Sequence, residues 1–456
     1  MDALTQKEQE RALPEDQRRR GQSALIKVAF TSNLMLQFFS GTVRTLFILS
    51  LGGRPSHVGI LTTLSSFSPI GQLLGLKLLP RFGKTHLYYL FRLVALLPFI
   101  ILIFMASQGT SSAALVWTAT VVIAAIPLAY TTSNTGWWPL IQDNTAGEAL
   151  GAFLARMRIR LRLLEVLAPL LVGAYLGAGA STRQFAPLFA VAFLATLLSG
   201  LLGRKIPEGP NTAFSSGLIK RLFEAGRVPA LRSYMNFTFL YGFIVSLSTP
   251  FWIILLKSRG MSEGRLVWLG TVAALGNMSF LKAWGRLVDS HGSRPAINFA
   301  LIGTALLGLT WLALPSGNGL PLLCWAVGFY LISGFCDSGL LMGTTKAMMN
   351  AIPLSHQAHS FTLLGLASAA GCALGGFIGG WCFQWLSDNQ VRIGAVDGTA
   401  AYLAVVQLSL LVAWWASKRL ARYGSETPFR HVAKQTWNYL LDKASNIAWG
   451  WVSRRD

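Results

Sequence analysis

The sequence predicts an all-α polytopic membrane protein with twelve transmembrane helices in two pseudo-symmetric six-helix bundles. Three observations support this fold: the composition, the recurrence of long apolar runs and an internal repeat. Of the 456 residues, 53% are hydrophobic and 12% are charged, and the mean hydropathy is +0.49. This composition is too apolar for a soluble domain, and the continuous runs are unlike the alternating strands of a membrane barrel.

Twelve runs are long enough to cross the bilayer as helices, which takes about 20 residues for about 30 Å of hydrocarbon. They fall into two sets of six, separated by a charged stretch near residue 215. The first set covers residues 26–51, 57–79, 86–107, 113–135, 160–179 and 185–203. The second set covers residues 231–256, 264–284, 295–314, 319–344, 360–386 and 398–417.

The two sets repeat each other at a nearly constant offset. Gly83 and Gly292 lie 209 positions apart, and Phe153 and Phe361 lie 208 positions apart. We therefore expect two parallel halves related by an axis along the membrane normal. The predicted parts are a cytoplasmic amino-terminal segment, an N-terminal bundle, a cytoplasmic linker, a C-terminal bundle and a cytoplasmic tail. They cover residues 1–25, 26–203, 204–230, 231–420 and 421–456.

The linker and the tail both carry amphipathic patterns. In the linker sequence AFSSGLIKRLFEAGR, Phe214 and Leu218 share a helical face opposite Lys220 and Arg221. Helices of this kind lie on the membrane surface, so we expect both segments on the inner leaflet. Recruitment of a protein partner is the alternative for the tail.

The positive charge is distributed asymmetrically along the chain. The net charge is +21, with 39 Lys and Arg residues. With the amino terminus inside, only six of these lie outside: Arg54, Arg183, Lys257, Arg259, Arg265 and Arg392. Because cytoplasmic loops are enriched in Lys and Arg, both termini are expected in the cytoplasm and the protein in the cell membrane, inner or plasma. The basic residues are expected to contact the anionic inner leaflet, not nucleic acid.

Several other classes of protein lack support in the sequence. The first 22 residues contain Glu8, Glu10, Glu15 and Asp16, unlike a cleavable signal peptide. The four cysteines lie within predicted spans without metal-binding spacing, so neither disulfides nor a metal site is expected. No phosphate-binding loop or nucleophile elbow is present. We expect no cofactor and no enzymatic activity.

One short loop carries a distinctive pattern. The stretch GRLVDSHGSRP joins spans eight and nine and contains Gly285, Asp289, Gly292 and Arg294. The glycines allow a tight turn, while Asp289 is placed to accept hydrogen bonds from the next helix and to pair with Arg294. Any short turn between helices favours such residues, so the spacing alone leaves its role open.

The pattern Gly-x-x-x-Asp-x-x-Gly-x-Arg resembles the loop signature of the major facilitator superfamily. In that family the signature lies between spans two and three and often recurs between spans eight and nine. The first copy here reads PRFGK, in which Arg81, Gly83 and Lys84 fit but Pro80 replaces the acid. The resemblance implies a monomeric secondary transporter, or permease, with a cavity for a small-molecule substrate between the two bundles.

In the family fold, spans one, four, seven and ten line the cavity. The resemblance therefore implies a polar and aromatic lining suited to a small polar or amphipathic solute. Many such residues instead join helices to one another, and about half are expected to do so. The candidates are Asn33, Gln37, Arg44, Tyr130, Asn134, Trp137, Asn236, Tyr241, Trp252, Tyr330 and Asp337.

Charged residues within the spans are few. Glu165 and Asp337 are the only carboxylates there and are the candidates for proton coupling, although Arg162 is placed to form a local ion pair with Glu165. Arg44 is the candidate for holding an anionic group of the substrate. Lys77, Arg92 and Lys282 are expected to extend toward the cytoplasmic interface.

Two hypotheses for function follow. The first is secondary transport of a small organic solute by alternating access, with possible proton coupling through Asp337. The second is a transporter-like membrane receptor or assembly factor that no longer transports, which the incomplete first loop and the long tail would fit.

Overall fold

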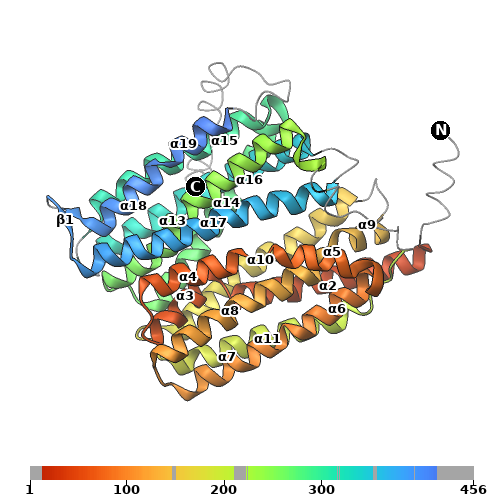
Figure 1. Ribbon diagram of the computed structural model, residues 1–456, viewed down its shortest axis with the longest axis horizontal. Coiled ribbons are helices and arrows are strands. Elements are labelled where there is room, and N and C mark those ends of the chain that lie inside the picture. The colour runs from red at the N-terminus through yellow and green to blue at the C-terminus, as the bar shows by residue number, and fades with distance from the viewer. Residues whose placement is uncertain are drawn as a thin grey trace, which may run out of the picture.

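The computed structural model describes residues 13–145, 150–209, 222, 224–315, 317, 319–352, 357–394 and 396–418. The predicted linker helix and the tail lie largely outside these residues. The described chain is almost entirely helical, and its helices form two groups, one from each half of the sequence (Figure 1). The twelve predicted spans therefore appear as twelve helical passes in two bundles.

Several passes of the N-terminal bundle consist of two consecutive helices. Its helices are α2 (Glu15–Phe38), α3 (Gly41–Ser50), α4 (Pro55–Ser66), α5 (Ile70–Phe82), α6 (Lys84–Val94), α7 (Leu96–Gln108), α8 (Ala113–Ser133), η1 (Asn134–Gly136), α9 (Trp137–Asn144), α10 (Leu150–Leu176), η3 (Thr182–Gln184) and α11 (Phe185–Gly203). The break between α2 and α3 has a local cause, because the Ser40 side chain caps α3 by accepting a hydrogen bond from the Val43 N–H.

The C-terminal bundle contains longer uninterrupted helices. Its elements are α13 (Pro229–Ser258), α14 (Glu263–His291), α15 (Ser293–Gly308), η4 (Leu309–Ala313), α16 (Leu320–Ala351), α17 (Gln357–Asp388), α18 (Gly398–Leu408) and α19 (Leu410–Ser417). A short antiparallel hairpin precedes the last pass, and it consists of β1 (Arg392–Ile393) and β2 (Val396–Asp397), with Arg392 opposite Asp397.

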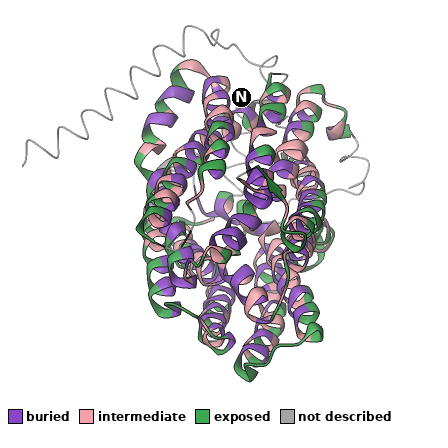
Figure 2. Cartoon of the chain, turned by 90° about the vertical axis from the view of Figure 1, so that its left-hand side faces the viewer, coloured by how far each residue is buried: buried purple, intermediate pink, exposed green. Residues whose placement is uncertain are grey.

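The outer surface of both bundles is apolar. Nine helical stretches among the described residues are long and apolar enough to cross a membrane. The other three passes are α2 with α3, α4 with α5, and α10, which contain charged residues or a break. Large apolar side chains such as Leu97, Phe104 and Leu171 are more than half exposed. Exposed residues occur along the helices of both bundles, and lipid would cover these apolar side chains (Figure 2).

Two helices begin well before the predicted spans. The helix α2 starts at Glu15 instead of residue 26, and α10 starts at Leu150 instead of residue 160. The predicted spans are bounded by the apolar runs. Charged residues do not end a helix, so these two helices extend beyond their apolar runs into charged sequence. The apolar pattern therefore located the spans but not the helix ends.

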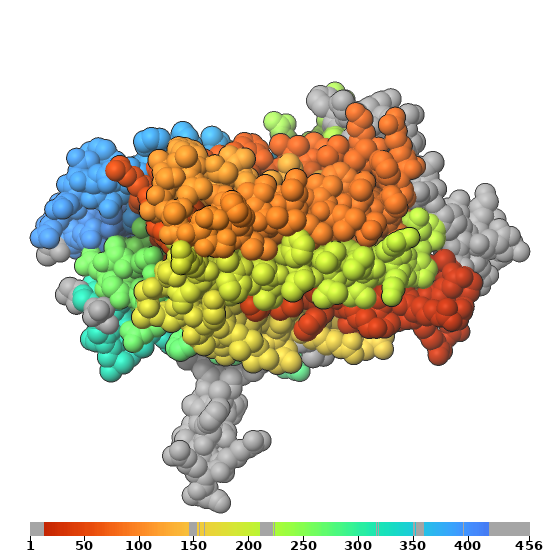
Figure 3. Space-filling model, turned by 90° about the horizontal axis from the view of Figure 1, so that it is seen from below, coloured from red at the N-terminus to blue at the C-terminus, as the bar shows by residue number. Residues whose placement is uncertain are grey.

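The two bundles are joined tightly at one end. A methyl group added to Gly59 would lie 2.5 Å from the Gly376 backbone oxygen, and one added to Gly264 would lie 2.3 Å from the Gly173 oxygen. The Gly264 N–H also donates a hydrogen bond to the Gly177 oxygen over 2.8 Å. This closed end is opposite the start of α2, and the space-filling view from below shows both bundles meeting there at its left-hand side (Figure 3).

Hydrogen bonds between the bundles also concentrate toward the closed end. Across the described residues they occur near the closed end or at mid-height of the bundle, for example from the Ser56 N–H to Gln384 Oε1 and from Thr271 Oγ1 to the Val166 oxygen. None joins the bundles at the end that carries the start of α2 within the described part of the chain. Among the described residues, hydrogen bonds therefore join the bundles at the closed end and at mid-height, and none does so at the opposite end.

Candidate functional site

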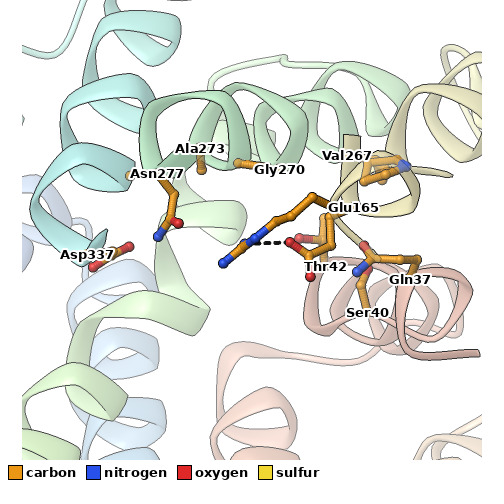
Figure 4. Close-up of a pocket in the computed structure, with 13 residues that line it drawn as sticks. Gln37, Ser40, Thr42, Glu165, Val267, Gly270, Ala273, Asn277 and Asp337 are labelled. Carbon is orange, nitrogen blue, oxygen red and sulfur yellow. Dashed lines mark hydrogen bonds and ion pairs between the residues drawn. The ribbon is translucent and has the colours of Figure 1, made fainter. Parts of the chain in front are cut away.

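A cavity of about 310 Å³ lies between the two bundles. Helices α2, α3 and α10 supply one wall, and α14 and α16 supply the other. Figure 4 shows Gln37, Ser40 and Glu165 on one side and Asn277 and Asp337 on the other. The lining residues are Gln37, Ser40, Thr42, Arg162, Glu165, Pro169, Val267, Gly270, Ala273, Ala274, Asn277, Gly334 and Asp337.

The charges of the N-terminal wall balance each other. Arg162 Nη1 lies 2.6 Å from Glu165 Oε2, which confirms the expected local ion pair. Asn33 Nδ2 donates to the other carboxylate oxygen over 3.4 Å, and Gln37 Nε2 donates to Asn33 Oδ1 over 3.1 Å. Positions three apart on α10 and four apart on α2 place these groups on facing helix surfaces. Glu165 thus has a counter-ion and a hydrogen-bond donor.

The C-terminal wall presents a carboxylate without such partners. The side chain of Asp337 points into the cavity and makes no hydrogen bond or ion pair with any residue that the structure describes (Figure 4). The oxygen of the neighbouring Asn277 side chain is buried and accepts no hydrogen bond there either. This wall therefore presents the Asp337 carboxylate to the cavity beside a buried Asn277 oxygen, and neither has a hydrogen-bond donor among the described residues.

Several expected lining residues lie outside this cavity. The Arg44 guanidinium turns back to the Ser40 backbone oxygen, at 3.4 Å, and lies over the Phe39 ring. Trp252 and Tyr330 belong to an aromatic cluster around Phe329, at 5.0 and 5.8 Å between ring centroids. Arg44, Trp252 and Tyr330 therefore contact other side chains and backbone of their own bundle and do not line the cavity.

Two further candidates from span seven also lie outside the cavity wall. Tyr241 stacks on Phe237, with the ring centroids 6.1 Å apart, and Asn236 is exposed. Span seven therefore contributes no side chain to this cavity, although its helix belongs to the same bundle as Asp337.

The span-four candidates surround Arg92, a buried cation that is expected at the cytoplasmic interface from its position in the sequence. Arg92 is only 1% exposed, so the expectation that it extends to the interface is wrong. Its guanidinium lies 3.5 Å from the centre of the Tyr130 ring, and Nη2 donates to Asn134 Oδ1 over 3.0 Å. Trp137 packs on Tyr88, whose ring also faces Arg92. The aromatic rings replace water around the cation.

Spans five and eight contribute to the cavity, although the family resemblance implies a lining from spans one, four, seven and ten. Arg162 is expected only as a partner of Glu165, and Asn277, Ser40 and Thr42 are not among the expected lining residues. A polar Asn277 inside an apolar run was a usable signal. The contribution of α10 and α14 depends on their packing against each other, for example through the hydrogen bond from Trp268 Nε1 to the Leu170 oxygen.

The loop between spans eight and nine forms the expected turn but not the expected pair. Gly292 has φ +88°, which requires glycine. Helix α14 continues to His291, so Asp289 lies in its last turn and is exposed. Within the described residues Asp289 therefore pairs neither with Arg294 nor with the start of α15. Gly285 lies inside the helix, and Lys346 of α16 instead caps α14 through the Val288 oxygen at 2.6 Å.

The incomplete loop between spans two and three obtains its acids from elsewhere in the chain. Gly83 again has a positive φ of 77° and separates α5 from α6, while Arg81 is exposed. Lys84 Nζ lies 2.6 Å from Asp143 Oδ2, and Glu208 Oε2 accepts a hydrogen bond from the Thr85 N–H over 2.8 Å. Asp143 and Glu208 thus provide the negative charge that Pro80 cannot provide.

Comparisons with known proteins agree with this architecture. The family model of the Major Facilitator Superfamily matches residues 234–452. No curated relative matches the sequence. Among solved structures, the nucleoside transporter NupG is similar with a TM-score of 0.65 and 13% identity, covering 88% of this chain and 99% of that chain. A D-xylose-proton symporter is similar with a TM-score of 0.66 and 14% identity, covering 87% and 96%.

A bacterial homologue of the human lysosomal transporter Spinster, solved in an inward-facing and unoccupied conformation, gives a TM-score of 0.63 at 15% identity and covers 90% and 99%. The matched sequence region lies in the C-terminal half, which also contains the complete loop pattern, and the structural similarity extends over both bundles. Residues 234–452 thus belong to the major facilitator superfamily, and both bundles share the fold of the solved transporters.

Proposed function

We propose that the protein is a secondary transporter that moves a small organic solute across the membrane by alternating access. The observation that carries the proposal is the cavity between two bundles that pack closely at one end. A rocking motion of the bundles about such a cavity would expose it to each side in turn. The structural neighbours are named as transporters of nucleosides and sugars, which supports solute transport in general.

The orientation follows from the distribution of Lys and Arg. With both termini in the cytoplasm, the closed end faces outward and the described conformation is inward-facing. The ion pair of Lys257 with Glu263, at 3.1 Å, then lies on the outer side.

Proton coupling is assigned to Asp337. A proton-coupled carrier needs a titratable group that each side of the membrane reaches alternately. Asp337 faces the cavity without a counter-ion among the described residues, whereas Glu165 is paired with Arg162 at 2.6 Å. Of the two carboxylates, Asp337 is therefore the one free to bind and release a proton during the cycle.

Flux measurements in proteoliposomes test both parts of the proposal. A panel of amines, amino acids, nucleosides and sugars is supplied without a proton gradient, with an inward gradient and with an outward gradient, and the accumulated solute is measured. The wild type should accumulate one class of solute in response to a proton gradient, and Asp337→Asn should lose this gradient-driven accumulation. Asp16→Asn is the matched control, because Asp16 is an exposed carboxylate at the start of α2.

Two results would contradict the proposal. Folded wild-type protein that moves no solute under any gradient would favour the transport-inactive receptor or assembly factor. Unchanged accumulation with unchanged pH dependence in Asp337→Asn would remove Asp337 from the coupling mechanism and leave transport itself intact.

A further inference from the structure

We propose that the transported solute carries a positively charged nitrogen group, which binds at the wall formed by Asp337 and Asn277. This inference rests on the proposed transport function and adds the chemical class of the solute. It follows from the charges and the unused hydrogen-bond acceptors of the cavity.

The cavity has an uncompensated negative charge. Its ionisable lining residues are Arg162, Glu165 and Asp337. Arg162 and Glu165 neutralise each other at 2.6 Å, which leaves the charge of Asp337. A carboxylate without a counter-ion inside a membrane protein is costly, so its charge must be balanced at each stage of the cycle. A proton balances it in one state, and a cationic solute balances it in the other.

The groups that surround Asp337 do not supply that balance. Tyr241 of α13 and Cys336 of the same helix interact with it electrostatically, and both side chains are uncharged near neutral pH. No cationic residue of α14 lines the cavity within the described chain. Lys346 is nine positions further along α16 and donates to the Val288 oxygen. Arg44 is engaged with Ser40 and Phe39 outside the lining.

The hydrogen-bonding groups of this wall favour a donor. Both the Asp337 carboxylate and the Asn277 oxygen are acceptors without a donor among the described residues. An ammonium or guanidinium group provides several N–H donors together with the positive charge. An anionic solute would leave these acceptors unsatisfied and add repulsion from the carboxylate.

The opposite wall and the volume limit the rest of the solute. Gln37, Ser40 and Thr42 provide neutral polar groups that suit hydroxyl or amide substituents. A volume of about 310 Å³ is at the lower end of the range for small-molecule sites. The solute is therefore a small organic amine or guanidine with polar substituents.

A cysteine reporter in the cavity tests the charge preference without knowledge of the solute. Cys324, Cys336, Cys372 and Cys382 are replaced by serine or alanine, and Thr42→Cys is added on the wall opposite Asp337. Reaction rates are measured in detergent with three methanethiosulfonates: the trimethylammonium-ethyl, the uncharged methyl and the sulfonatoethyl reagents. Each rate is divided by the rate of the same reagent with a free thiol in solution. Ala274→Cys serves as a second reporter if Thr42→Cys does not fold.

The expected result is a normalised rate at least tenfold higher for the cationic reagent than for the anionic reagent. Asp337→Asn should bring this ratio close to one, Asp337→Glu should preserve it, and Asp16→Asn should leave it unchanged. A ratio near one in the wild-type background, or a ratio that Asp337→Asn does not lower, would overturn the inference.

This outcome is separable from that of the transport proposal. A cation-selective cavity without solute flux would contradict transport and leave the charge preference standing. Solute flux through a protein whose cavity lacks cation selectivity would contradict the inference alone.

Discussion

Lys84 and Asp143 lie 59 positions apart in the sequence, yet their side chains form an ion pair at 2.6 Å. Both side chains are largely buried, with 5% and 18% exposed. Asp143 also accepts a hydrogen bond from the Gly209 N–H over 3.0 Å, so it ties α6 to the segment that follows α11. The loop motif of the N-terminal bundle is thus completed in space by an acid from α9.

Asp143→Asn should destabilise the protein because it leaves the buried ammonium of Lys84 without a counter-ion. Breaking a buried pair from one side typically costs about 3 to 5 kcal/mol, so the melting temperature of the purified protein should fall by several degrees. Asp289→Asn is the control, since Asp289 is exposed in the corresponding loop of the other bundle. Equal melting temperatures of the two variants would show that the Lys84 pair contributes nothing.

Glu263→Gln should favour opening of the closed end. The carboxylate accepts from the Gly179 N–H over 3.0 Å and pairs with Lys257, so it joins the two bundles. Loss of a hydrogen bond to a charged group costs about 1.5 to 3 kcal/mol, or about tenfold or more in the ratio of closed to open molecules.

The measurement is labelling of Thr42→Cys by an impermeant reagent from the closed side in proteoliposomes. Asp397→Asn is the matched control, because Asp397 pairs with Arg259 within the C-terminal bundle, at 2.7 Å. Faster labelling in the control than in Glu263→Gln would argue against this role for Glu263.

Gly264→Ala and Gly285→Ala should have opposite effects on thermal stability. A methyl group at Gly264 would collide with the Gly173 oxygen, whereas no atom lies within 4 Å of the corresponding position at Gly285. We expect the first substitution to cost about 1 to 3 kcal/mol by overpacking. The second should stabilise α14 by up to about 1 kcal/mol, since alanine favours helix. Melting temperatures of both variants decide this, and a stabilised Gly264→Ala would contradict the close packing.

Arg92→Lys should destabilise the N-terminal bundle although the charge is kept. The planar guanidinium stacks on Tyr130 and reaches Asn134, which an ammonium cannot do in the same geometry. A desolvated cation–π contact contributes about 2 kcal/mol, so a clear loss in thermal stability is expected. Lys282→Met is the control, because Lys282 is exposed. If Arg92→Lys melts at the wild-type temperature, the stacked geometry is unimportant.

The proposed orientation predicts opposite sidedness for two exposed positions. In a cysteine-free background, Thr110→Cys should react with an impermeant maleimide in intact cells, and Lys205→Cys should react only after permeabilisation. The distribution of Lys and Arg is the physical basis of this expectation. Labelling of both positions in intact cells would refute the topology.

The first-half loop and Arg92 show why sequence spacing did not suffice for the site. Pro80 indicated a missing acid, but Asp143 and Glu208 are 63 and 128 positions further along the chain. The position of Arg92 near the end of its span predicts a side chain at the cytoplasmic interface. The sequence does not show that Tyr130 and Asn134 of another pass surround it. In both cases the partner belongs to another helix, and no local pattern reports it.

The sequence by itself determined the membrane class, the twelve spans and the two halves, because hydrocarbon requires about 20 apolar residues per helix and this requirement is local. It also predicted that Asp337 lines the cavity, since charges within apolar runs are few. It predicted the ion pair of Glu165 with Arg162 as well, since partners three positions apart meet on a helix. Only the tertiary structure decided that α10 and α14 line the cavity, that Asp289 is unpaired among the described residues and that Arg92 is buried. These features depend on which faces of distant helices pack together, and glycine contacts such as that of Gly264 with Gly173 determine that packing.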